Sequence, residues 1–333
     1  MKNLYKIKIV FGVLILAILA VSCVEGLEFK ELGDGGETWI KLNPASSDGF
    51  FLKVAEPTDQ PQTFDLLDIR KDASSVSAQN TSTTVLLEFD LGILTAYNTA
   101  NGTDFIPIPE ADYSTVPAAS GGNITVTFAP GDFAQKVSLT IPNAFNLDPA
   151  NQYAMGYRMQ VTSGGVLSTS SPAELVVQVL PKNLYDGVYE VTAISPMIDV
   201  TSDNLVGEYP FDFHLITTGA HSVDTYGATY IHTYGHVIYV ISGDYLSRYG
   251  SFSPQLQFNP DGSGEIIGAT NYYGNPASNT RGMLLDDTQT WSWDPVTRNI
   301  RIKYHMTMTS AVPDPPHIRT TFDELWTYKG TRD

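Results

Sequence analysis

Residues 123–141 read NITVTFAPGDFAQKVSLTI and contain two short segments in which apolar and polar side chains alternate. Val126 and Phe128 alternate with threonines in the first segment, and three apolar residues from Val137 onward alternate with polar residues in the second. This period of two is typical of β-strands with one buried face. The Pro-Gly-Asp sequence at 130–132 favours a turn between them. The stretch therefore predicts a pair of antiparallel strands.

The same pattern recurs between residues 38 and 181, which contain seven or eight short candidate strands and almost no helical periodicity. Many short strands separated by turn residues within about 140 residues are typical of an immunoglobulin-like β-sandwich. The buried cysteine pair of antibody domains is absent, because Cys23 is the only cysteine of the chain. The similarity to immunoglobulin domains is therefore one of architecture.

Several distinctive motifs in this region resemble the N-terminal domain of unknown function found in surface lipoproteins of Bacteroidota. The motifs are YN at 97–98, NGTDFIPIP at 101–109, Tyr113, FAPG at 128–131, LDP at 147–149 and Tyr153. The resemblance covers roughly residues 38–181. It implies a β-sandwich, and it implies a gene encoded near outer-membrane glycan-uptake systems of the starch-utilisation type. In some members of the family a glycosidase barrel follows this domain.

A boundary is expected at residues 181–183 (PKN). The sequence NLYDGVYEV at 183–191 resembles the start of the second domain in the same lipoproteins, where a D-G-x-Y strand begins a small antiparallel β-barrel of lipocalin-like character. The rest of the chain fits such a barrel. Residues 255–258 and 265–268 flank the turn NPDGSG, residues 291–293 and 300–306 form a second predicted hairpin, and residues 324–328 form the last strand.

The N-terminus has the features of a bacterial lipoprotein signal. Three lysines within the first eight residues precede an uncharged, largely apolar run at 9–21, which is shorter than the roughly 20 residues that a membrane-spanning helix needs. The sequence LAVSC at 19–23 resembles a lipobox, which implies acylation of Cys23. The predicted domains are thus a signal peptide (1–22), the lipidated cysteine and a flexible tether (23–37), the sandwich (38–181) and the barrel (182–333).

Acidic residues follow Cys23 in the tether and resemble the export signal that directs Bacteroidota lipoproteins to the outer face of the outer membrane. The sequence therefore predicts a protein held in the outer membrane by lipid, with its body facing the cell exterior. No cysteine remains for a disulfide, so the fold depends on its core alone.

The charge of the chain argues against a nucleic-acid partner. The formal net charge is −17, with 19 lysines and arginines against 36 acidic residues. Phosphate binding needs clustered basic residues, which this chain lacks. An acidic body is also unsuited to direct adsorption on an anionic membrane surface.

Sequence motifs of catalysis are absent. We find no nucleophile elbow, zinc-protease motif, phosphate-binding loop or dinucleotide fingerprint, and the C-terminal half is too short for a glycosidase barrel. Asp286 and Asp287 are adjacent, so on a strand they point to opposite faces, and we expect them to solvate a loop. His232 and His236 lie about 13 Å apart on a predicted strand, too far to share a metal. We therefore predict a protein without catalytic activity, cofactor or metal.

The remaining candidates for function are aromatic side chains in the second half of the chain. Flat rings stack on the apolar C–H face of a sugar at little conformational cost, and polar side chains at their edge bind the hydroxyls. Tyr272 and Tyr273, in a loop-like segment, are expected to be exposed. The paired tryptophans Trp291 and Trp293 could form a two-ring platform, but the alternation on the paired strand favours the barrel interior for them. The predicted glycan-binding residues are Tyr272, Tyr273, Tyr245, Tyr249, Arg248, Trp291 and Trp293.

Three functions follow from these patterns. The first is a non-catalytic surface lipoprotein that binds glycan as an accessory to an outer-membrane polysaccharide uptake system. The second is an adhesin or structural accessory subunit that contacts a protein partner, which an exposed apolar patch would favour. The third is a lipocalin-like binder of a small apolar ligand, which requires a barrel interior not filled by its tryptophans.

Overall fold

The computed structural model describes residues 37–43, 48–274 and 281–332. The predicted signal peptide, Cys23 and the tether up to residue 36 lie outside the described residues. In the described part of the chain, no helix is long and apolar enough to cross a membrane.

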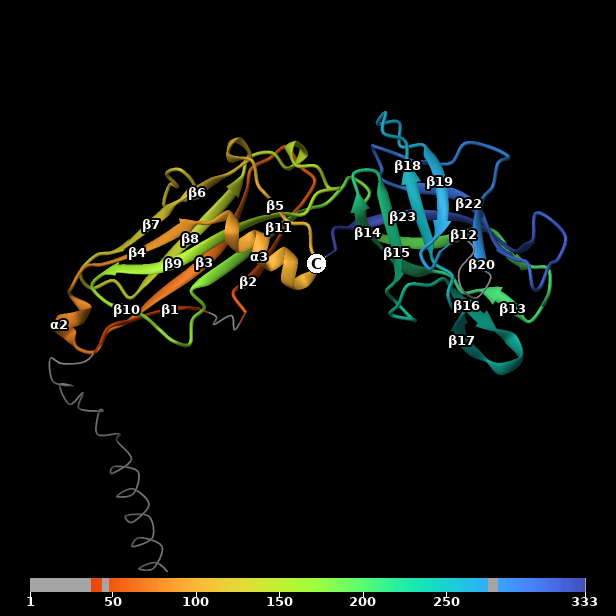
Figure 1. Ribbon diagram of the computed structural model, residues 1–333. Coiled ribbons are helices and arrows are strands. Elements are labelled where there is room, and N and C mark those ends of the chain that lie inside the picture. The colour runs from red at the N-terminus through yellow and green to blue at the C-terminus, as the bar shows by residue number, and fades with distance from the viewer. Residues whose placement is uncertain (1–36, 44–47, 275–280, 333) are drawn as a thin grey trace, which may run out of the picture.

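The protein is almost entirely β-structure, and its strands form two lobes that follow one another along the chain (Figure 1). We call residues 39–181 the sandwich and residues 187–330 the barrel. The predicted all-β fold class, a sandwich followed by an antiparallel barrel, is confirmed.

The sandwich consists of two sheets packed face to face. The strands of the first sheet are β1 (Trp39–Leu42), β3 (Gln62–Asp72), β6 (Ser114–Val116), β8 (Ala134–Ile141) and β10 (Val166–Leu167). Those of the second are β2 (Phe50–Ala55), β4 (Thr83–Phe89), β5 (Ile106–Pro107), β7 (Ile124–Phe128), β9 (Tyr153–Ser163) and β11 (Glu174–Pro181). Their orders are β10-β1-β3-β8-β6 and β2-β11-β9-β4-β7, with β5 added beside β9.

The alternation of apolar and polar residues at 123–141 is seen directly in these sheets. Ile124, Val126 and Phe128 of β7 are buried, while the threonines between them are exposed. On β8 the buried residues Val137, Leu139 and Ile141 alternate in the same way. However, β7 and β8 belong to different sheets, so the Pro-Gly-Asp turn joins the two layers and does not close a hairpin. The two apolar faces meet to form the core of the sandwich.

Helices are few and short: α2 (Val76–Gln79), α3 (Leu91–Asn101) and the 3₁₀ turns η1 (Glu110–Asp112), η2 (Ala144–Asn146) and η3 (Ile241–Gly243). Helix α3, which the sequence pattern did not predict, packs on the outer face of β9 and β11 through Ile93 and Leu94. Asp90 caps its first turn and Gly102, with φ +65°, ends it. Glycine, threonine and asparagine inside the helix weaken its propensity and its pattern, which is why alternation dominated the prediction.

The barrel is built mainly from one antiparallel sheet. Its strands are β12 (Gly187–Asp199), β14 (Phe211–Gly219), β15 (Ser222–Gly227), β18 (Pro254–Phe258), β19 (Ile266–Asn271), β20 (Arg281–Leu285), β21 (Ser292–Trp293), β22 (Ile300–Met308) and β23 (Ile318–Gly330). The order is β19-β18-β15-β14-β12-β23-β22-β20, with β21 also paired to β22. A small sheet of β13 (Leu205–Gly207), β16 (Val237–Val240) and β17 (Tyr245–Arg248) lies at one side (Figure 1).

Two hydrogen bonds bring the ends of this sheet together and nearly close the barrel. The Ile266 amide of β19 donates to the carbonyl of Trp291, 2.8 Å away, just before β21. At the other end of β19, the Asn271 side chain donates to the Arg281 carbonyl of β20 at 3.0 Å. The inward-facing side chains of this closed sheet then form a single core.

Large side chains fill the barrel interior. Its largest fully buried residues are Trp326, Tyr189, Tyr304, Phe213, Phe252, Phe258 and Phe322. Trp291 and Trp293 add to this core and are only 3% and 5% exposed. The packing therefore disfavours the lipocalin-like hypothesis, which needed an interior that the tryptophans leave open.

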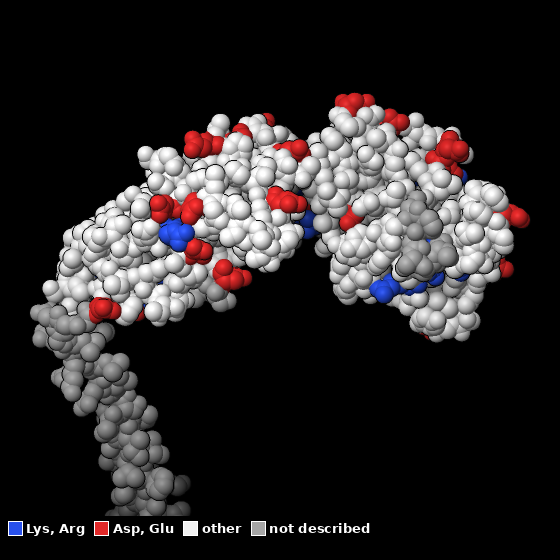
Figure 2. All heavy atoms as spheres, in the orientation of Figure 1, with Lys and Arg blue, Asp and Glu red and all other residues white. Residues whose placement is uncertain are grey.

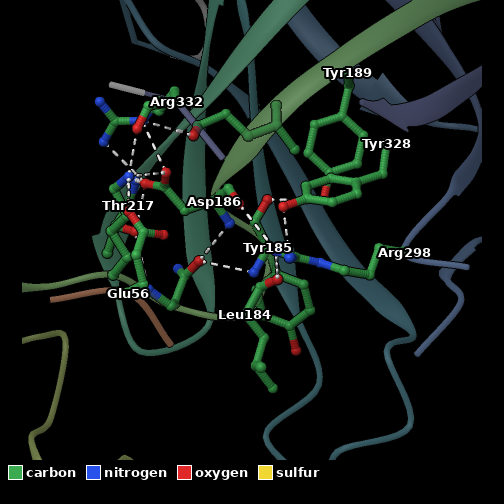
Figure 3. A network of polar contacts seen from close by, with 12 residues as sticks. Glu56, Leu184, Tyr185, Asp186, Tyr189, Thr217, Arg298, Tyr328 and Arg332 are labelled. Carbon is green, nitrogen blue, oxygen red and sulfur yellow. Dashed lines mark hydrogen bonds and ion pairs between the residues drawn. The ribbon is translucent and has the colours of Figure 1, made fainter. Parts of the chain in front are cut away.

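A buried ionic network joins the sandwich to the barrel (Figure 3). The ammonium of Lys182, at the end of β11, donates to Glu56 at 2.6 Å and to the carbonyl of Arg332 at 2.7 Å. Asp186 accepts hydrogen bonds from the guanidinium of Arg332 and from both the amide and the hydroxyl of Thr217, all at 2.8–2.9 Å. Lys182 and Asp186 are buried, and each is held in position by more than one partner.

Candidate functional site

A shallow groove of about 350 Å³ runs along the outer surface of the barrel over β18. Polar, uncharged side chains from β14, β15, β18 and β19 line most of it. The lining residues are Thr218, Ser222, Gln255, Leu256, Gln257, Gly268, Ala269 and Thr270. Amide and hydroxyl groups in this arrangement offer both donors and acceptors to a ligand.

One strand position in the lining of the groove lacks a side chain. Gly268 on β19 pairs with Gln257 on β18, which in turn pairs with Ser222 on β15. A Cβ placed on Gly268 would meet only the Gln257 side chain, at 3.5 Å, and the backbone there is in a region open to all residues. Glycine at this position therefore leaves space that another residue would fill without strain.

Four tyrosines gather beside the groove, and we call Tyr226, Tyr234, Tyr272 and Tyr273 the tyrosine cluster. The rings of Tyr234 and Tyr272 stack with centroids 3.9 Å apart and planes within 4°. Tyr226 meets Tyr234 edge to face at 5.5 Å, and Tyr273 meets Tyr272 in the same way at 5.0 Å. The Tyr273 hydroxyl also donates to the carbonyl of Tyr234 at 3.0 Å. These contacts hold the rings in fixed orientations.

Tyr272 is positioned by the buried side chain of Asn271 at the end of β19. The Asn271 amide group donates to the carbonyl of Ser251 at 2.9 Å, and its oxygen accepts from the amide of Ser253 at 3.0 Å. The Tyr272 amide donates to the Ser253 carbonyl at 2.9 Å. The backbone before the ring is therefore tied to the start of β18, which places Tyr272 on the outer face.

Strand β15 connects the groove to the tyrosine cluster. Val223 and Thr225 are buried in the barrel wall, so Ser222, Asp224 and Tyr226 alternate onto the outer side. Ser222 lines the groove, Tyr226 belongs to the cluster and Asp224 lies between them. We call the groove, Asp224 and the tyrosine cluster together the binding face.

The binding face carries little charge. Asp224 is the only charged residue among those that define it, and no lysine or arginine lines the groove. In Figure 2 the visible surface over β18 and β19 is almost free of charged side chains. Such a surface suits an uncharged, hydroxyl-rich ligand better than a polyanion.

The structure brings some of the predicted site residues to this face. Tyr272 and Tyr273 are 39% and 37% exposed and belong to the tyrosine cluster. Arg248 is exposed and packs against Gly235, the neighbour of Tyr234. Tyr245 is exposed as well, but it lies at the other end of β17 and has no ring contact with the cluster among the described residues.

Three predicted site residues are corrected. Tyr249 is buried, and its hydroxyl donates to Asp199 at 2.7 Å. Trp291 and Trp293 point into the barrel, where Trp291 donates to the carbonyl of Asp286 at 2.6 Å. Their two-residue spacing puts both rings on one side of the strand, as expected, but that side is the core. None of the three can stack on a ligand at the surface.

Sequence reasoning missed Tyr234, Asp224 and Gln255. The segment around Tyr234 was read as a strand, whereas residues 228–235 form a loop that a bridge between Gly227 and Thr233 closes. This loop carries Tyr234 onto Tyr272, 38 residues further along the chain. The glycines at 227 and 235, which bracket the segment, were the signal of a loop that the sequence offered.

A second polar cluster lies inside the barrel and is closed to solvent. The carboxylate of Glu324, which is fully buried, accepts hydrogen bonds from Tyr209 (2.6 Å), His236 (2.7 Å), Trp326 (2.8 Å) and Tyr304 (2.9 Å). Burial alone would raise the pKa of Glu324, but the charge on His236 and the hydrogen bonds it accepts outweigh burial and lower that pKa. Because every group of this cluster has a hydrogen-bond partner, we assign the cluster a structural role in the core of the barrel.

No group of three or more metal-ligating side chains comes together among the described residues. Asp286, predicted to solvate a loop, is instead buried and forms an ion pair with Lys303 at 3.0 Å. Neither observation adds a catalytic group to the binding face.

A match to a protein-family model falls in the same part of the chain as the resemblance predicted from the sequence. A family model described as an N-terminal domain matches residues 44–166, which lie within the sandwich. No curated protein matches the chain. The family match covers the part of the chain in which the sequence resembled the Bacteroidota domain.

Solved structures from Bacteroides match most of the length of this chain at low sequence identity. One protein of unknown function from Bacteroides ovatus matches with 10% identity and a TM-score of 0.44, over 88% of this chain and 95% of its own. Another from the same organism matches with 12% identity and a TM-score of 0.40, over 86% and 90%. An auxiliary nutrient binding protein from Bacteroides thetaiotaomicron matches with 14% identity and a TM-score of 0.36, over 84% and 90%.

Proposed function

We propose that the protein binds an uncharged oligosaccharide on the binding face of the barrel and does so without catalysis. The observation that carries this proposal is the tyrosine cluster beside an uncharged groove of amides and hydroxyls. A sugar ring has an apolar C–H face that packs on an aromatic ring, and its hydroxyls exchange hydrogen bonds with amide and hydroxyl side chains. Both kinds of group lie on one continuous surface here.

Several features support a ligand of this class. The rings are held by one another and by Asn271, so little side-chain entropy is lost on binding. The groove is shallow and open, which suits one stretch of a long chain. The net charge of −17 disfavours acidic polysaccharides. The filled barrel interior leaves the outer surface as the place for a ligand.

Truncating the tyrosine cluster tests the proposal. In calorimetric titrations with malto-, cello-, xylo- and mannohexaose, we expect Tyr272→Ala to weaken binding of the preferred oligosaccharide at least about tenfold, or about 1.4 kcal/mol. Tyr245→Ala is the matched control, because Tyr245 is also an exposed tyrosine but is not part of the cluster. Equal affinities of the wild type and Tyr272→Ala, with the fold intact, would place the site elsewhere.

We also propose that the mature chain is anchored by lipid on Cys23 in the outer membrane, with its body facing the cell exterior as an accessory to polysaccharide uptake. The support is the basic and apolar sequence before Cys23 and the resemblance of residues 38–181. In the native host, Cys23→Ser is expected to abolish incorporation of labelled fatty acid and to release the protein from the membrane fraction. Retention of both in Cys23→Ser would rule the anchor out.

A protein partner is the second candidate function. Ile194, Ile198 and Val200 of β12 and its following turn are each more than half exposed, and such residues can belong to a docking surface. The tyrosine cluster and its groove favour the oligosaccharide, because a flat protein interface would not need a groove lined by amides and hydroxyls.

A further inference from the structure

Asp224 is an unusual residue for the outer wall of a barrel. It points to the outer side of β15, yet it is only 6% exposed. No lysine, arginine or histidine forms an ion pair with it in the described part of the chain. Burial raises the pKa of Asp224, and the hydrogen bond from Gln255 offsets this only in part. A carboxylate in this setting lowers stability when it is ionised.

Two consecutive hydrogen bonds across three strands hold the carboxylate of Asp224. The Gln255 side chain on β18 donates to Asp224 Oδ1 at 2.6 Å. The oxygen of the same Gln255 side chain accepts from the hydroxyl of Thr270 on β19 at 2.9 Å. These bonds fix the plane of the carboxylate, and Oδ2 accepts no hydrogen bond from the described residues. One oxygen thus remains available, beside the groove that Gln255 and Thr270 line.

Asp224 also faces the tyrosine cluster. Burial, the neighbouring Tyr272 and the charge of Asp224 together raise the pKa of Tyr234, whose ring meets that of Tyr226 edge to face at 5.5 Å. Tyr226 follows two positions later on the same side of β15, and His214 of β14 pairs with Tyr226. The titratable and charged groups around Asp224 are therefore the tyrosines, His214 and Arg332, whose charge lowers the pKa values of Tyr234 and His214.

We propose, resting on the oligosaccharide-binding function above, that Asp224 is the specificity-determining residue of the binding face and accepts hydrogen bonds from hydroxyls of the sugar stacked on the tyrosine cluster, with Gln255 as its positioning residue. An ionised carboxylate offers only acceptors and forms charge-assisted bonds about twice as strong as neutral ones. An asparagine would accept the same hydrogen bond from Gln255 without a buried charge. The charge of Asp224 is therefore expected to contribute to ligand binding and not to the stability of the fold.

The substitution Asp224→Asn separates these two roles. At neutral pH we expect it to weaken binding of the preferred hexaose about tenfold, while the protein becomes more resistant to denaturant. The sign follows from the raised pKa of Asp224: the ionised form destabilises the folded state, so removing the charge stabilises it at pH values above that pKa. A purely structural role predicts unchanged binding.

The pH profile provides a readout that a structural role would not change. The affinity of the wild type is expected to fall as the pH decreases through the raised pKa of Asp224, because the protonated carboxyl loses its charge-assisted bonds. The affinity of Asp224→Asn is expected to stay flat over that range. Gln255→Ala, which frees the carboxylate, should weaken binding less than Asp224→Asn and keep the pH dependence.

The controls separate this inference from the function on which it rests. If Tyr272→Ala weakens binding but Asp224→Asn does not, Asp224 does not determine specificity and the binding function stands. The same conclusion follows if the affinities of Tyr272→Ala and Asp224→Asn depend on pH in the same way. If neither variant weakens binding, or if folded wild-type protein binds none of the four hexaoses, the binding face itself is wrong and the inference fails with it.

Discussion

Replacing Glu324 with leucine is expected to lower the free energy of unfolding by about 3–5 kcal/mol, the usual loss when one partner of a buried ion pair is removed. Four donors converge on this carboxylate: the hydroxyls of Tyr209 and Tyr304, the indole of Trp326 and the imidazole of His236. Without Glu324 they remain in the core without an acceptor, and each unsatisfied buried group costs about 1–3 kcal/mol.

The position of His236 increases the expected loss. One ring nitrogen faces Glu324 at 2.7 Å and the other faces the carbonyl of Val237 at 2.7 Å, so both nitrogens lie against oxygen atoms in the core. Glu324→Leu would leave the first of these nitrogens without a partner. Chemical denaturation followed by tryptophan fluorescence measures the effect, because Trp326 lies in the cluster itself.

A control and a pH series complete the measurement. Glu190→Ala removes an exposed glutamate paired to Lys329 at 3.4 Å and should cost less than about 1 kcal/mol. The pKa of Glu324 is lowered in the fold, so its contribution to stability is present above the unfolded-state pKa and is lost as the pH falls through the lowered value. A loss for Glu324→Leu no larger than for Glu190→Ala would show that the core does not depend on this cluster.

Filling the groove is expected to have the largest effect on binding. Gly268→Leu adds a side chain at the position that leaves the groove open, beside Gln257. The backbone accepts the change without strain, and leucine is a better strand residue than glycine, so stability should be unchanged or higher. We expect binding of the preferred oligosaccharide to weaken at least about a hundredfold, or about 2.8 kcal/mol.

The matched control for this variant is Ser292→Leu. It adds the same side chain at an exposed strand position on β21, outside the groove. Calorimetry should show wild-type affinity for Ser292→Leu, and Gly268→Ala should fall between the wild type and Gly268→Leu. An unchanged affinity in Gly268→Leu would mean that the ligand does not occupy the groove.

Local sequence patterns predicted most of the fold, because strands and turns are encoded by neighbouring residues. The alternation in β7 and β8 and the turn between β18 and β19 are examples. The helix α3 was missed because glycine, threonine and asparagine weaken its interior pattern, although Asp90 and Gly102 mark its two ends.

The binding face depends on contacts between residues far apart in the sequence, which local patterns do not contain. Asp224 meets Gln255 31 positions away, because β15 pairs with β18. Tyr234 reaches Tyr272 only because a loop folds back over β15. Exposure of Tyr272 could be predicted from its loop-like neighbours, but whether Trp291 and Trp293 faced inward depended on how β21 joined the closed barrel.

The most direct test of the central claim is a glycan-array screen of soluble protein from residue 24 onward, with the hits confirmed by calorimetry. Our account predicts binding to uncharged oligosaccharides and no preference for acidic ones. Well-folded protein that binds no glycan on the array, or that selects acidic glycans, would contradict it.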